Sequence, residues 1–101
     1  MPDIAKYQDR LNQAAEKYLD DTSNPFDLYP ATGERALGIA TYCAAHEVAD
    51  EMSKRELTDF LGISEYESEL DGKGVQYMRN IIAAVLRKHV SFSEEVRARS
   101  I

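Results

Sequence analysis

Apolar residues recur every three or four positions along most of the chain, which is the spacing of amphipathic α-helices. The clearest stretch, residues 2–20, starts at Pro2, a residue favoured in the first helical turn. Its apolar face consists of Ile4, Tyr7, Leu11, Ala14, Ala15, Tyr18 and Leu19. No segment alternates apolar and polar residues over a useful length, as a half-buried strand does. The pattern therefore predicts an all-α fold.

A second helix is predicted over residues 33–52, and its apolar face is rich in small residues. One row of this face contains Leu37, Ala40, Ala44, Val48 and Met52, and beside it lie Ala36, Ile39 and Cys43. Alanines let neighbouring backbones approach closely. We therefore expect this helix to be the central one, with the others packed around it.

The last long helix is predicted over residues 75–90. Its apolar row is Val75, Met78, Ile82, Val85 and His89, with Ile81 and Leu86 on its flanks. The wide apolar strip favours burial in the core of the same chain. The near-heptad spacing leaves a second interpretation open, a homodimer joined through Val75, Met78, Ile82 and Val85.

Two capping boxes, Ser53 with Glu56 and Ser64 with Glu67, predict two short helices over residues 54–61 and 65–71. Gly62 and Gly72 follow their ends, where a left-handed residue commonly stops a helix. A further short helix is predicted over residues 94–99. The expected architecture is a compact all-α bundle of five or six helices, with the two short capped helices in the middle, forming one domain over residues 1–101.

Residues 53–70 resemble a helix-turn-helix element. The residues that carry the resemblance are Leu57, Thr58, Leu61, Gly62 in the turn and Ile63. The second helix departs from the pattern, because Ser68 stands where a buried aliphatic residue is usual. Acidic residues at positions 65, 67, 69 and 71 would also face DNA phosphates and repel them. The corner is therefore a degenerate version of that motif.

The charge of the chain is unevenly distributed. The net charge of its 101 residues is −6, but residues 47–71 contain nine acids and two bases, a net −7. Residues 72–101 contain two acids and six bases, a net +4. Within the block, the like-charge pairs Glu65/Glu69 and Glu67/Asp71 are locally unfavourable for a helix, so either this basic C-terminal third neutralises that segment within the fold or an external basic partner does. The overall acidity argues against nucleic-acid binding, which depends on cations.

The sequence contains no complete catalytic or cofactor-binding motif. Cys43, His46, Glu47 and Asp50 have the helical spacing of metal ligands, but completing such a site needs another ligand from elsewhere. Residues 71–74 resemble part of a calcium loop, but Met78 stands where its last glutamate is needed, so we interpret them as a turn. We expect no enzyme activity, cofactor or metal. A single cysteine and an N-terminus without an apolar stretch suggest the cytoplasm and no membrane anchor.

These features lead us to expect a non-enzymatic regulator or inhibitor that binds another protein, one with a basic surface, through an acidic helical surface. The expected contact residues are Glu56, Asp59, Glu65, Tyr66, Glu67, Glu69 and Asp71. In size and charge the chain resembles the small inhibitors that bacteriophages direct at host nucleic-acid-handling complexes, such as anti-CRISPR proteins. The alternative is a helix-turn-helix regulator that binds DNA through Arg79, Arg87, Lys88, Arg97 and Arg99.

Overall fold

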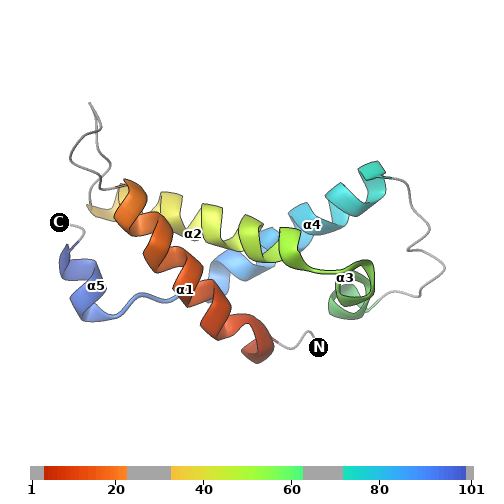
Figure 1. Ribbon diagram of the computed structural model, residues 1–101, viewed down its shortest axis with the longest axis horizontal. Coiled ribbons are helices and arrows are strands. Elements are labelled where there is room, and N and C mark those ends of the chain that lie inside the picture. The colour runs from red at the N-terminus through yellow and green to blue at the C-terminus, as the bar shows by residue number, and fades with distance from the viewer. Residues whose placement is uncertain (1–3, 23–32, 63–71, 100–101) are drawn as a thin grey trace.

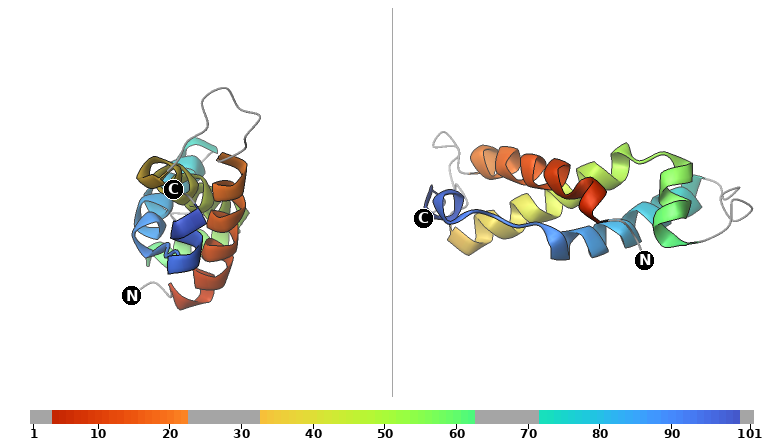
Figure 2. Two further views of the ribbon diagram at one scale, coloured as in Figure 1. Left: turned by 90° about the vertical axis from the view of Figure 1, so that its left-hand side faces the viewer. Right: turned by 90° about the horizontal axis from the view of Figure 1, so that it is seen from below.

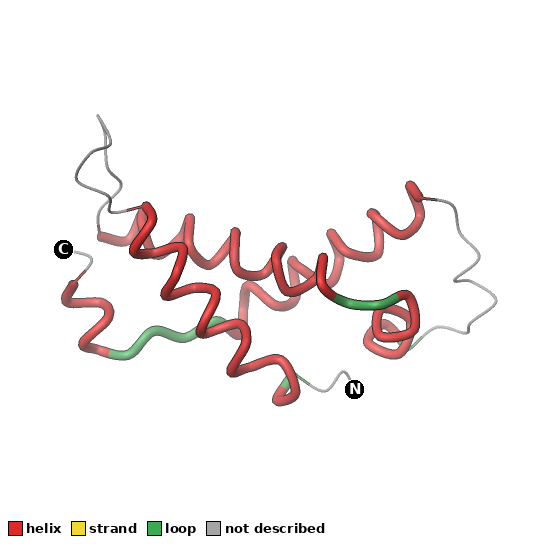
Figure 3. The backbone as a smooth tube through the Cα atoms, viewed as in Figure 1, coloured by secondary structure: helices red, strands yellow, loops and turns green. Residues whose placement is uncertain are grey.

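The computed structural model describes residues 4–22, 33–62 and 72–99, and these ranges form helices without any strand (Figure 3). In chain order the elements are α1 (Ala5–Thr22), α2 (Gly33–Glu51), α3 (Lys54–Leu61), α4 (Gly72–Leu86), the 3-10 turn η2 (Arg87–His89) and α5 (Glu94–Arg99). The predicted all-α bundle is therefore confirmed (Figure 1). The predicted helix over 65–71 and the Ser64 capping box lie outside the described residues. In the described part, no helix is long and apolar enough to cross a membrane.

Helix α2 lies between α1 and α4, as its small apolar residues predict (Figure 2). Five alanines of α2 and two of α1 are fully buried: Ala36, Ala40, Ala44, Ala45 and Ala49, with Ala14 and Ala15. An alanine buries little area by itself, but it lets two helix backbones approach closely and interlock. Close packing of α1 on α2 follows from these residues.

The described core has a large part, a small part, and a third cluster of three alanines, Ala14, Ala15 and Ala44, where α1 meets α2. The large part joins α1, α2, α3 and α4, and its largest fully buried side chains are Leu11, Val48, Leu57, Ile82 and Leu86. The small part lies at the other end of α2, where Leu19, Leu37 and Val96 of α5 pack together with two alanines. Both parts depend on α2, which therefore organises the whole bundle.

Helix α3 has the termini that the sequence predicts. The Ser53 side chain accepts a hydrogen bond from the Glu56 backbone at 3.2 Å, and the Glu56 carboxylate accepts one from the Ser53 backbone at 3.4 Å, which completes the capping box. Gly62 ends the helix with φ of +70°, a conformation that favours glycine. Leu57 and Thr58 are buried, as in the first helix of the motif that this segment resembles.

Two expectations for the last long helix are wrong. Residues 72–74 belong to the first turn of α4 and do not form a turn between helices, so Gly72 begins a helix instead of ending one. His89 is exposed in η2 and does not continue the buried row, because the α-helix ends at Leu86. The flanking residue Ile81 is 37% exposed.

The rest of the apolar row on α4 is used by the chain itself. Met78 and Ile82 are buried in the large core, and Val75 and Val85 pack against it from its edge. A homodimer joined through these four residues would have to open that core. The row therefore packs in the core of its own chain, which is the interpretation that the wide apolar strip favours.

Candidate functional site

The two predicted acidic contact residues that the structure describes, Glu56 and Asp59, have different surroundings. The Glu56 carboxylate faces α1, where it accepts a hydrogen bond from the Tyr7 hydroxyl at 3.1 Å and lies 4.0 Å from the Lys6 ammonium. Asp59 is exposed, on the outer side of α3. Glu65, Tyr66, Glu67, Glu69 and Asp71 lie outside the described residues. Glu56 therefore joins α3 to α1, whereas Asp59 forms no ion pair with a described residue.

The pKa of the Glu56 carboxyl reflects these internal contacts. The hydrogen bond from the Ser53 backbone lowers it, and the Tyr7 hydroxyl and the Lys6 charge lower it further, against a smaller opposing effect of partial burial. Each of these donors or charges favours the ionised carboxylate. Glu56 consequently stays charged to a lower pH than an ordinary glutamate.

A second set of ion pairs joins α1 to α2. The Arg10 guanidinium lies 2.9 Å from the Glu47 carboxylate and also binds Glu51. Glu47 accepts a further hydrogen bond from the Tyr18 hydroxyl at 3.1 Å, and the Lys17 ammonium lies 3.6 Å away. Three acids of the acidic block are thus paired with groups of α1.

The described part of the acidic block is neutralised by a helix that was not predicted to do so, whereas residues 65–71, for which a counter-charge was predicted, lie outside the described residues. Among the described residues, the internal counter-charges of the block come from Lys6, Arg10 and Lys17 of α1, and not from the C-terminal third. These three bases were missed as site residues. Their spacing of four and seven puts them on one side of a helix, and that basic stripe was the signal in the sequence.

Glu47 is the most enclosed of these carboxylates. Partial burial acts to raise its pKa, but hydrogen bonds from Tyr18 and Arg10 and the charge of Lys17 outweigh burial, so the pKa is lowered from its ordinary value. The carboxylate keeps its charge because its donors replace the lost water. Glu47 is therefore a stable negative charge at neutral pH.

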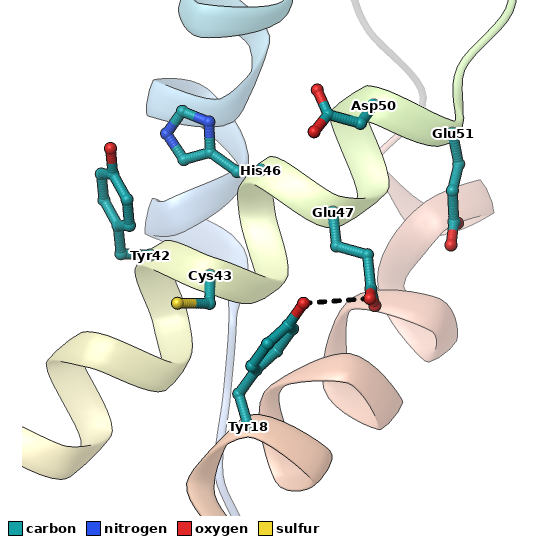
Figure 4. A pocket seen from close by; sticks show the side chains of 7 residues that line it. All are labelled: Tyr18, Tyr42, Cys43, His46, Glu47, Asp50 and Glu51. Atoms are coloured by element: carbon teal, nitrogen blue, oxygen red, sulfur yellow. Dashed lines mark hydrogen bonds between the residues drawn. The ribbon is translucent and has the colours of Figure 1, made fainter. Parts of the chain in front are cut away.

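An open depression of about 480 Å³ lies on α2 beside these ion pairs, with one wall from α1 (Figure 4). Its lining consists of Tyr18, Tyr42, Cys43, His46, Glu47, Asp50 and Glu51. The centroids of the Tyr42 and His46 rings lie 4.4 Å apart with the ring planes tilted by 43°, and the Arg87 guanidinium lies 5.6 Å from the centre of the Tyr42 ring. The depression therefore combines aromatic rings with carboxylates.

The four residues with metal-ligand spacing, Cys43, His46, Glu47 and Asp50, all line this depression. Although these residues share a helix, their side chains do not point toward one position: Glu47 is directed to Tyr18, whereas the His46 ring lies against the Tyr42 ring at a tilt (Figure 4). Across residues 4–22, 33–62 and 72–99, no three His, Cys, Asp or Glu side chains are placed to hold a metal ion. Among the described residues, the depression therefore offers no built metal site.

Three of the basic residues named for DNA binding, Arg79, Arg87 and Arg97, have contacts within the fold. Arg79 donates a hydrogen bond to the Ala49 carbonyl, which satisfies an acceptor in the last turn of α2. Arg97 lies 3.9 Å from the Glu34 carboxylate, and Arg87 rests on Tyr42. Lys88 is exposed, and the Arg99 side chain lies outside the described part.

Comparison with known proteins adds no relative, because no family model, curated protein or solved structure matches the chain.

Proposed function

We propose that this protein is a non-enzymatic regulator or inhibitor that acts in the cytoplasm by binding a basic surface of another protein. One observation carries the proposal: Asp50, near the C-terminal end of α2, and Asp59, in the last turn of α3, are exposed and form no ion pair with a described residue. Their carboxylates are open to a cationic partner, whereas those of Glu47, Glu51 and Glu56 are occupied by α1.

The charge pattern around these two residues supports the same interpretation. The sequence adds Glu65, Glu67, Glu69 and Asp71 to the block, but no base between Arg55 and Lys73. Exposed charges of one sign speed the encounter with a partner of opposite sign and select against partners of the same sign. A protein groove built to hold nucleic-acid phosphates has that opposite sign, and an inhibitor of the kind that phages direct at host complexes would occupy such a groove.

Capture from a bacterial lysate tests the proposal. The immobilised wild type should retain a protein at low salt and less of it at moderate salt, because long-range attraction between exposed charges is screened. The variant D50N/D59N and the variant E65Q/E67Q/E69Q should each retain less. The matched control D9N/E16Q, which removes two exposed acids from α1, should retain the wild-type amount.

A DNA-retention assay separates the alternative from the proposal. A helix-turn-helix regulator should bind a labelled duplex at low salt, bind it more tightly as E65Q/E67Q/E69Q, and release it as R87E/K88E. That result, or equal protein capture by the acidic variants and by D9N/E16Q, would contradict the proposed function. The internal contacts of Arg79, Arg87 and Arg97 favour the protein-binding proposal, because they draw these side chains toward groups of the protein itself.

A further inference from the structure

We infer that the depression on α2 is the part of the surface that receives an arginine or lysine side chain of the protein partner. This inference rests on the proposed function and specifies where the partner makes contact. The depression was described above by its seven lining residues, three of which are carboxylates and two of which are tyrosines. Its occupant, in this proposal, is a basic segment of another protein.

The shape of the depression suits one long side chain and part of its neighbours. Tyr18 and Glu47 form one side, Tyr42, His46 and Asp50 form the other, and Cys43 lies between them (Figure 4). The volume of about 480 Å³ lies within the usual range of about 300–1,000 Å³ for sites that enclose a small ligand. The depression is open to solvent, so a side chain that projects from a partner can enter without a rearrangement of the helices.

The charges of the lining identify the chemistry of the occupant. Arg10 and Lys17 reach Glu47 and Glu51 from the α1 side. Asp50, on the opposite side, is exposed and has no such counter-charge among the described residues. A cation that enters the depression therefore meets Asp50 as a partner for an ion pair, whereas a phosphate or carboxylate is repelled by that uncompensated charge.

The aromatic residues favour a cation for an independent reason. The Lys17 ammonium lies 5.3 Å from the centre of the Tyr18 ring, and Arg87 holds the same relation to Tyr42. The chain thus already uses both rings for cation–π contacts with its own bases. Tyr42 is nevertheless 51% exposed, which leaves much of its surface for a partner. Tyrosine and arginine are also the residues most enriched where binding energy concentrates at protein interfaces.

Cys43 provides a direct test, because it is the only cysteine of the chain and it is half-buried in the depression. The rate of its alkylation by iodoacetamide is measured with and without a hexa-arginine peptide. When the peptide is present at about ten times its Kd, the free fraction of the site falls to about a tenth, so alkylation should slow about tenfold. A hexa-glutamate peptide should leave the rate unchanged, and added salt should remove the protection.

Three variants locate the contact. For each variant, the rate of Cys43 alkylation with the peptide is compared with the rate of the same variant without it. D50N and Y42A should lose most of the protection, and D9N/E16Q should keep it. If hexa-arginine binds but does not slow alkylation, or if D50N is protected as well as the wild type, the peptide binds elsewhere and the inference is overturned. In that case, salt-sensitive capture lost in E65Q/E67Q/E69Q would still support the proposed function. A wild type that binds no hexa-arginine peptide would also overturn the inference.

Discussion

At the scale of single residues, replacing two glycines by alanine should change the free energy of unfolding in opposite directions. Gly38 lies inside α2 on its exposed side, with no atom near the position of an added Cβ. The variant G38A should raise the free energy of unfolding by about 1 kcal/mol, because alanine favours a helix interior. Gly62 has φ of +70°, so G62A should lower it by about 1–2 kcal/mol. Urea unfolding of both variants measures the two effects, and a destabilised G38A would mean that α2 needs flexibility there.

Glu47 and Glu56 predict how stability depends on pH. The pKa of each carboxyl in the folded protein is below its ordinary value of 4.5, which approximates the unfolded chain. Their contribution is therefore complete above about pH 4.5 and is lost as the pH falls through the lowered folded-state pKa. Urea unfolding at pH 7 and at pH 3 should show lower stability in acid.

Substitution assigns this acid sensitivity to a residue. E47Q should lower the free energy of unfolding at pH 7 by about 1 kcal/mol, because it loses the charge that pairs with Arg10 and Lys17. Between pH 7 and pH 3, the free energy of unfolding of E47Q should also fall by less than that of the wild type. The matched variant E16Q changes an exposed acid of α1 and should behave like the wild type. If the free energy of unfolding falls equally in E47Q and in the wild type between pH 7 and pH 3, groups other than Glu47 cause the acid sensitivity.

At the scale of elements, α3 depends on its first turn. Replacement of Ser53 by alanine removes the side-chain acceptor of the capping box, and S53A should lower the free energy of unfolding by about 1 kcal/mol. Because Leu57 of the same helix is buried in the large core, the loss should appear in the global transition. S91A, an exposed serine in the loop before α5, is the control and should stay within about 0.5 kcal/mol of the wild type.

Elements whose signals are local were predictable from the sequence. Ser53, Glu56 and Gly62 mark the two ends of α3 by short-range hydrogen bonds and by one backbone angle, so its bounds agree with the structure. The start of α4 was not predictable by the same rules. Glycine is a poor residue for a helix interior, yet α4 begins at Gly72 and continues through Gly74 toward Val75 and Met78, which pack on the core. Tertiary packing overrides helix propensity at that point.

At the scale of the whole molecule, the charge partners of the acidic block depend on which helices are neighbours. Periodicity identifies the buried sides of α1 and α2, but the pairing of Arg10 with Glu47 spans 37 positions of sequence. No local rule relates two such residues. The same holds for the depression, because Tyr18 of α1 joins the residues of α2 only once the two helices are packed. The sequence indicates the four lining residues of α2 that have helical spacing, Cys43, His46, Glu47 and Asp50. It does not indicate that Tyr18 of α1 lines the same depression.

The division of the core into a large and a small part has a consequence for how the molecule opens. Within the described chain, α5 is held mainly by Val96 and by the nearby Phe92, whereas α3 and α4 are anchored in the large part. Local unfolding that releases α5 therefore leaves the large part intact and exposes little apolar area. Backbone amides of α5 should exchange with deuterium faster than those of α4. The variant V96A should raise the exchange rate of the α5 amides and leave the exchange rate of the α4 amides unchanged. The C-terminal helix would then behave as a separate, weaker cooperative unit, and a protease would cut beside it before it cut the bundle.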